Sequence, residues 1–535
     1  MPITTASFFA SRRHRRAAGF ALPLLVAVLA GCAAVGPDYQ PPATAAPAGW
    51  EEWRSGDGGR AGAVGATASR PLSDQWWTSF DDPVLNDLQD RAAQASPDLR
   101  TAALRFAQAR MQRMTVAAQR GPTLDATGAI NRQRQSEYAA GTRLADAVAP
   151  ANREALISVL SEPFNLYQGG FDASWEPDLW GRVRRSIESA DASVDDAGAL
   201  FDQTRLAVAS ELARDYFELR LTQQQRALTR QDIAAARDGL DLLRARARGG
   251  LIDDLDVARQ QSLLADLQAR APALQASEAA LMNQIGLLVD ARPGDLNSLL
   301  AARADSSLEA LPAHLPDLAL GLPSEAARRR PDIRAAEARL HAATADIGVA
   351  VADLYPRITL GASFGYESFK GSRFGEWGTR TWSIGPSLSL PLFDQGRRRA
   401  VIELRSLQQQ EAAVAYQQTV LKAWQEVDDA LTGYAAERTR NSELRTKARA
   451  SGQAYDLAKA RYAGGLTDFL VQLDAERTWL QARRDLADSN HRVFQRLIAV
   501  YKAVGGGDPQ ALQPPASEQA QNNRLPPAAE MVISK

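Results

Sequence analysis

The sequence predicts an α+β membrane protein built on a two-fold internal repeat, in which each copy has two strands and long coiled-coil helices. Three observations lead to this fold class. Short motifs recur at fixed intervals along the 535 residues, apolar and polar residues alternate in four segments, and two proline-free helical stretches are too long for a compact domain. Beyond the N-terminal leader, no segment has 18 consecutive apolar residues, so any membrane crossing must be made by strands.

Residues 1–31 have the composition of a secretory signal peptide. Four arginines between residues 12 and 16 precede an uncharged run, 17–31, that is too short for a comfortable transmembrane helix. The run leads into Leu29-Ala30-Gly31-Cys32, which resembles the signal of a bacterial lipoprotein, where the cysteine is acylated and becomes the mature N-terminus. An ordinary signal peptide with a chance cysteine is the alternative.

Cys32 is the only cysteine in the sequence, so no internal disulfide can form. In an exported chain, a lipid-bearing role explains a lone thiol better than a redox role does. We therefore expect an N-acyl and an S-diacylglycerol group on Cys32, and no cofactor. Residues 32–75, which are rich in Pro, Gly and Ala, then form an acylated N-terminal arm.

The composition argues against two classes of function. The net charge is −1 and the basic residues are scattered, so nothing points to nucleic acid. After the leader the histidines are His314, His341 and His491, which are far apart, and the sequence has no paired-carboxylate motif, nucleophile elbow or phosphate loop. We expect neither an enzyme nor a metal site.

Two sets of motifs recur along the sequence. Ser96-Pro97-Asp98-Leu99-Arg100 recurs as Arg330-Pro331-Asp332-Ile333-Arg334, and Pro122 recurs at the same interval as Pro356. At a shorter interval, Gly249-Gly250-Leu251-Ile252-Asp253 returns as Gly464-Gly465-Leu466-Thr467-Asp468, and Gly181 as Gly396. The sequence is therefore interpreted as a tandem duplication, 76–290 and 323–508, with a linker at 291–322 and a disordered C-terminal tail at 509–535.

Each copy begins with a helix of about 22 residues, starting at Pro97 or Pro331, and continues with two segments of period two. These segments predict strands at about 123–138, 164–177, 357–369 and 380–391. A soluble sandwich edge gives similar alternation, but strands of about ten residues with aromatics on the apolar face fit an outer-membrane barrel. Because four strands cannot close a barrel, several chains must share it.

A very long helical stretch follows each strand pair, at 182–248 and 397–461, each of about 66 residues and roughly 100 Å. A glycine pair then turns the chain, and return helices are expected at 251–288 and 466–504. In the first return helix, apolar residues such as Leu264, Leu267 and Leu274 follow the spacing of a coiled-coil seam. We expect Pro272 to kink that helix.

Distinctive motifs are spread over nearly the whole mature chain. They are Gly31-Cys32 with Val35-Gly36-Pro37-Asp38-Tyr39; Trp175-Glu176-Pro177-Asp178-Leu179-Trp180-Gly181-Arg182; Arg329-Arg330-Pro331-Asp332-Ile333 with Ala336-Glu337 and Ile347-Gly348; Pro391-Leu392-Phe393-Asp394; Tyr462 to Gly465 with Leu473-Asp474-Ala475; and Tyr501-Lys502-Ala503 with Gly505-Gly506-Gly507. Together with the predicted elements they resemble the TolC-like outer-membrane efflux proteins, specifically the NodT-type lipoproteins of RND efflux systems. Asp508 departs from that family, which usually has an aromatic residue there.

The resemblance implies a homotrimer that shares one 12-stranded β-barrel in the outer membrane and an α-helical periplasmic tunnel. Such a trimer is a passive duct that exports small molecules, drugs or other toxic compounds. Its implied partners are outer-membrane lipid, which takes up the acyl chains on Cys32, a periplasmic adaptor protein and an inner-membrane RND-type pump. The alternatives are a TolC-like duct for type I protein secretion and a structural coiled-coil envelope lipoprotein, although the latter leaves the strands without a purpose.

A gate of the duct is expected where the helical hairpins turn, at about 249–256 and 463–474. By resemblance, the family's rings of leucine and aspartate correspond to Leu470 and Asp474, with Arg477 three residues on. Three leucines make an apolar plug, and three carboxylates around one axis repel each other and select charge. The alternatives are seam packing for Leu470 and an intrahelical ion pair between Asp474 and Arg477.

The tips of the two hairpins are the expected contact with the adaptor. The residues concerned are Gly249, Gly250, Asp253, Gly464, Gly465 and Asp468. For the glycines, turn formation is a second role compatible with the first. For Asp253, Asp254 and Asp468, the alternative is helix capping, because carboxylates favour the positive end of the helix dipole.

Overall fold

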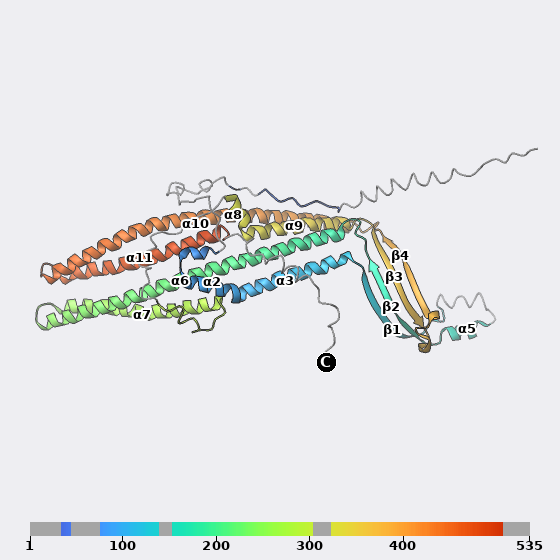
Figure 1. Ribbon diagram of the computed structural model, residues 1–535, viewed down its shortest axis with the longest axis horizontal. Coiled ribbons are helices and arrows are strands. Elements are labelled where there is room, and N and C mark those ends of the chain that lie inside the picture. Colours follow the sequence, from blue (N-terminus) through green and yellow to red (C-terminus); the bar gives the residue numbers. More distant parts are fainter. Residues whose placement is uncertain (1–33, 44–45, 47–74, 139–151, 303–322, 507–535) are drawn as a thin grey trace, which may run out of the picture. The chain divides into compact units, whose positions relative to one another are not determined.

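The computed structural model describes residues 34–43, 46, 75–138, 152–302 and 323–506 (Figure 1). The expected signal peptide with Cys32, most of the arm, much of the linker and the C-terminal tail lie outside the described residues. Within the described part of the chain, no helix is both long and apolar enough to span a bilayer. The described residues form two compact units: unit 1 contains 34–40, 109–138, 152–193 and 340–412, and unit 2 contains the remainder.

Unit 1 contains a four-stranded antiparallel sheet whose order follows the chain (Figure 1). Its strands are β1 (Thr123–Gln133), β2 (Phe164–Trp175), β3 (Arg357–Ser368) and β4 (Arg380–Ser389). The strand expected at 123–138 thus ends earlier, at Gln133. Between β1 and β2 lies a short helix that the alternation of residues did not predict, α5 (Arg153–Leu160).

Two long helices begin in unit 1, and each is capped by an aspartate that precedes it. Asp178 accepts hydrogen bonds from the backbone N–H groups of Val183 (3.0 Å) and Arg184 (2.9 Å), and so caps α6 (Arg182–Arg248). Asp394 plays the same role for α10 (Arg397–Ala463), accepting from Gly396 and Arg398 at 3.1 and 3.3 Å. Each carboxylate satisfies N–H groups that have no partner inside the helix.

The N-terminal segment 34–40 is held against unit 1 by one buried arginine. Arg185 donates hydrogen bonds to the backbone oxygen of Val35 (3.2 Å) and to the Asp38 carboxylate (2.5 Å). The ring of Tyr39 stacks on that of His341, with centroids 4.1 Å apart. This part of the expected arm is therefore packed on the protein in a defined conformation.

Unit 2 contains two helical hairpins, α6 with α7 (Asp254–Leu288) and α10 with α11 (Phe469–Ala503) (Figure 1). The long helices have 67 residues each and the return helices 35 each. The remaining helices are α2 (Pro83–Ala95), α3 (Pro97–Ala117), α8 (Pro323–Arg329) and α9 (Pro331–Ala352); parts of α3, α6, α9 and α10 lie in unit 1. Helix α7 continues through Pro272 without a break, so the proline does not end the helix there.

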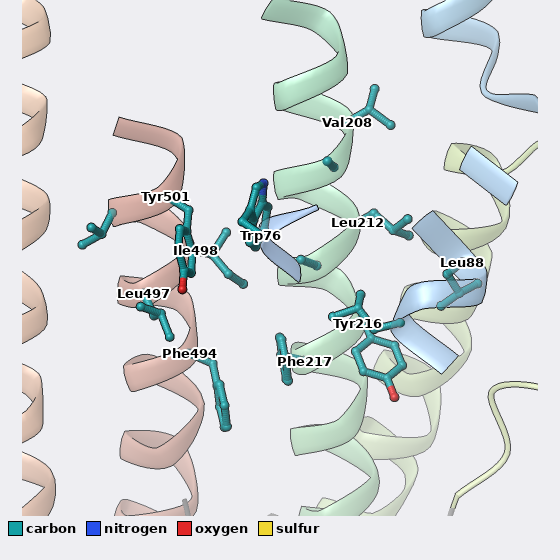
Figure 2. Packing of buried hydrophobic residues seen from close by; sticks show 14 of the residues in the cluster. Trp76, Leu88, Val208, Leu212, Tyr216, Phe217, Phe494, Leu497, Ile498 and Tyr501 are labelled. Atoms are coloured by element: carbon teal, nitrogen blue, oxygen red, sulfur yellow. The ribbon is translucent and has the colours of Figure 1, made fainter. Parts of the chain in front are cut away.

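The main core of unit 2 joins α6 to α11 (Figure 2). Phe217 of α6 stacks on Phe494 of α11, with centroids 4.5 Å apart. Trp76, in a short 3-10 helix at Trp76–Phe80, stacks on Tyr501 at 5.1 Å. Each large buried side chain of this kind contributes roughly 1.5–3 kcal/mol, and the core therefore fixes the two helices side by side.

Candidate functional site

The sheet of unit 1 exposes one apolar face. Strand register places Ala126, Phe171, Phe364 and Trp382 in a single row across β1, β2, β3 and β4. The large apolar side chains exposed on this face are Leu124, Ile130, Phe171, Trp175, Leu360, Phe364, Trp382, Ile384 and Leu388. A contiguous apolar surface of this kind marks a face that contacts a protein partner or a membrane.

The opposite face of the same sheet is polar. The neighbouring row contains Asp125, Asp172, Ser363 and Ser383, one from each strand. The hydroxyls of Ser363 and Ser383 lie 2.9 Å apart, and Thr127 donates a hydrogen bond to Asp172 at 3.1 Å. Because residues alternate between faces along a strand, the sheet separates an apolar surface from a hydrophilic one.

Among the described residues, β1 and β4 each pair with only one strand. An edge strand presents a row of backbone N–H and C=O groups that can pair with another strand. In the described part of the chain, the sheet therefore has two free edges as well as an exposed apolar face.

In unit 2 the two hairpin turns have the same backbone geometry. Gly250 and Gly465 have φ angles of +72° and +71°, which L side chains rarely adopt. Gly250 donates to the Ala247 carbonyl at 2.9 Å, and Gly465 to the Tyr462 carbonyl at 3.0 Å. The predicted role of the glycine pairs as turn formers is confirmed in both hairpins.

The two aspartates expected at the tips differ in what they do. Asp253 accepts a hydrogen bond from Leu255 N–H at 3.3 Å and caps α7. Asp468 occupies the corresponding position before α11, but its side chain makes no capping hydrogen bond. Both side chains, like the glycine pairs, are exposed.

Leu470, Asp474 and Arg477 lie on one exposed face of α11. Their spacing of four and three residues places them along the same side of a helix, and each is exposed, Leu470 by 50%. The buried side of this turn is formed instead by Phe469 and Leu473, which pack in a cluster with apolar residues of α6 and α7.

Two alternative roles proposed for these residues are absent from the structure. Asp474 and Arg477 form no ion pair with each other, although both side chains are described. Leu470 is not a member of the buried seam cluster, which contains its neighbour Phe469. The exposed face of α11 thus carries an apolar, an acidic and a basic side chain without a partner among them.

Comparison with known proteins shows which family the chain resembles. The model of the outer membrane efflux protein family matches residues 88–288 and 322–506. The chain belongs to this family. Outer membrane protein OprJ of Pseudomonas aeruginosa is 33% identical over 90% of this chain and 95% of its own length. Nodulation protein T of Rhizobium leguminosarum bv. viciae is 30% identical over 92% and 93%. The solved structure of the outer-membrane channel OprN is 34% identical, covers 88% of this chain and 99% of its own, and has a TM-score of 0.76.

Two of the motifs that resemble the family have a structural role in this outer membrane efflux protein. Arg330, buried in unit 2, donates hydrogen bonds to the Ala503 carbonyl (2.7 Å) and to the carboxylates of Asp332 (2.7 Å) and Glu426 (2.6 Å). Cβ of any side chain at Gly505 would lie 3.1 Å from the Arg330 backbone. The RRPDI and Gly505-Gly506 motifs therefore meet, a contact that sequence spacing does not reveal.

A second feature of this efflux protein that sequence reasoning missed lies at the hairpin turns. The guanidinium of Arg246, near the end of α6, is 5.1 Å from the ring centroid of Tyr462, near the end of α10. Tyr462 also contacts Phe469, with ring centroids 5.5 Å apart. A cation–π contact of this kind links the two hairpins at their tips. Tyr462 was noted as part of a motif, but nothing in the sequence identified its partner.

Proposed function

We propose that three copies of this chain form a passive duct that exports small molecules across the outer membrane and periplasm. The observation that carries this proposal is the sheet with one apolar face, one polar face and two free edges. Three such sheets joined edge to edge make 12 strands, enough to close a barrel with its apolar face toward lipid and its polar face toward a lumen. The long helices then form the periplasmic tunnel.

The mass of the detergent-extracted assembly tests the trimer. Light scattering coupled to size-exclusion chromatography should give three chains per particle after the detergent contribution is subtracted. A monodisperse monomer with native helix content would contradict the shared barrel, because four strands cannot close one. A dimer would contradict the 12-stranded barrel, because it supplies only eight strands.

The gate of this duct is proposed to be the exposed face of α11. Leu470, Asp474 and Arg477 share that face and have no partner among one another. In a trimer, three leucines around the axis exclude water and ions, and three aspartates attract cations. The turns at Gly249-Gly250 and Gly464-Gly465, with Asp253 and Asp468, are proposed as the surface that meets a periplasmic adaptor protein and, through it, an inner-membrane RND-type pump.

Acylation of Cys32 is proposed to anchor each chain to the outer membrane. A multiply acylated N-terminus supplements an integral barrel rather than replacing it. The test is incorporation of labelled palmitate in cells that express wild type or Cys32→Ser. The wild type should be labelled and the variant should not, and label retained by Cys32→Ser would refute acylation at this residue, since the chain has no second cysteine.

A further inference from the structure

An open cleft of about 460 Å³ lies along the seam between α6 and α11 in unit 2. Its wall contains Leu228 and Asp232 from α6, Tyr455 from α10, and Glu476, Leu480 and Arg483 from α11. The cleft is not part of the gate face described above. Its volume lies in the range of small-molecule sites, about 300–1,000 Å³.

Part of the wall of the cleft is made of aromatic and charged groups that contact one another. Tyr455 stacks on Trp479, with ring centroids 5.1 Å apart and planes inclined by 12°. The guanidinium of Arg483 lies 4.8 Å from the Trp479 ring centroid and forms an ion pair with Asp232 at 3.2 Å. The charges of Arg483 and Asp232 are therefore paired with each other.

Glu476 is the acidic group of the cleft that remains without a partner. Glu476 is only 7% exposed. Its carboxyl group forms no hydrogen bond or ion pair in the described part of the chain. Burial and the nearby Asp232 raise the pKa of Glu476, while Lys459 and Arg477 act in the opposite direction. A buried carboxyl without a donor is costly to keep charged, and a cationic donor in the cleft removes that cost.

We propose that this cleft binds an amphiphilic organic monocation, with its ammonium group on the Glu476 carboxylate and its apolar body against Leu228, Leu480 and Trp479. Asp232 and Arg483 are paired with each other, so Glu476 is the acidic group in the wall of the cleft that is left for the ligand to pair with. A metal ion is a poor match, because no group of three or more His, Cys, Asp or Glu side chains among the described residues can hold one.

The proposed binding site and the proposed gate lie on different sides of α11, and the binding site does not depend on the gate. Glu476 follows Asp474 by two residues, which is about 200° around a helix. Asp474 is accordingly exposed and Glu476 buried on another side of α11. A bound cation bridges α11 to α6, so occupancy favours the present packing of the helix that carries Leu470 and Asp474. The binding itself needs only the fold of unit 2, whether or not the assembly conducts.

Equilibrium dialysis of the full-length, detergent-extracted protein tests the site with 1-naphthylmethylammonium and its neutral counterpart 1-naphthalenemethanol. Wild type should bind the cation saturably and at least about tenfold more tightly than the alcohol, a difference of about 1.4 kcal/mol. Glu476→Gln should lose that preference. The matched control is Glu443→Gln, which removes an exposed carboxylate from α10 and should bind like wild type.

Absence of saturable cation binding by wild type, or equal cation binding by wild type and Glu476→Gln, would overturn the proposal. A second measurement needs no variant. Between about pH 7.5 and about pH 4.5, protonation of Glu476 should weaken binding of the cation and leave the alcohol unchanged. The other titratable or charged groups that face Glu476 are Asp232 from α6, Tyr455 and Lys459 from α10, and Arg477 and Arg483 from α11. An unchanged cation affinity across that range would also overturn it.

Discussion

Phe171 of β2 and Phe364 of β3 lie directly opposite each other, and their residues are 56% and 44% exposed on the same face of the sheet. The residues beside them, Asp172 and Ser363, are paired on the opposite face. A single chain in water gains nothing from exposing two aromatic rings in this way. The pairing therefore favours a sheet whose apolar face is covered by lipid.

Lysine substitution on the two faces of β3 should have opposite outcomes. Phe364→Lys places a charge on the apolar face, at a cost of about 2–4 kcal/mol near the middle of a bilayer. Ser363→Lys, one residue earlier, places the same charge on the polar face. We expect Phe364→Lys to be depleted from carbonate-washed outer membranes and Ser363→Lys to be retained. Equal retention of the two variants would show that this face does not contact lipid.

Alanine at the second glycine of each turn should loosen the hairpin tip. Gly465 has φ +71° with no heavy atom near its missing Cβ, so the cost of Gly465→Ala is backbone strain, about 1–2 kcal/mol. Gly464→Ala is the matched control, because its Cβ makes only ordinary contacts at 3.6 Å. Amide hydrogen exchange around 464–468 should be faster in Gly465→Ala alone. Identical exchange in both variants would exclude the strain.

Removal of the cap of α6 should lower thermal stability. Asp178→Ala deletes two hydrogen bonds to backbone N–H groups and also the ion pair with Arg184, and a lost cap costs about 0.5–2 kcal/mol. Asp191→Ala breaks only the exposed ion pair with Arg113, for which about 0–1 kcal/mol is typical. The midpoint of thermal unfolding, followed by circular dichroism, should fall more for Asp178→Ala. The account of the cap fails if Asp191→Ala has the larger effect.

Acid should weaken unit 2 through His491. Burial lowers the pKa of His491 to about 4, and a carboxylate oxygen of Glu218 lies 3.8 Å from its Nε2. The unfolded chain binds the proton more readily, so stability is full above about pH 6.5 and falls as the pH drops to about 4, by up to about 3 kcal/mol. His491→Gln should show a shallower fall of unfolding free energy over this range. Parallel curves for wild type and variant would contradict the prediction.

Much of the fold could be predicted because its signals are local. The absence of proline between residues 182 and 248, and the glycine pair that follows, predicted a long helix, which the structure shows at Arg182–Arg248. The alternation around Phe364 located β3 within one residue of its observed bounds, Arg357–Ser368. Both signals depend only on neighbours along the chain.

The remainder depends on contacts between distant segments. Helix α5 lies in a stretch of the sequence where the spacing of apolar residues indicates neither a helix nor a strand. Arg330 meets Ala503, and Arg246 meets Tyr462, through folding alone. Glu476 is the clearest case: a glutamate in a polar helix is expected at the surface, yet packing of α11 on α6 and α10 leaves it buried.

Single-channel conductance in a planar bilayer tests the central claim most directly. The samples are the purified wild type and the double variant Leu470→Ala with Asp474→Ala, each first shown to have the same mass in detergent. The account predicts a small, cation-selective conductance for wild type that rises sharply in the double variant, because the apolar plug and the ring of carboxylates are both removed. Correctly assembled samples of both forms that produce no channels would contradict the duct.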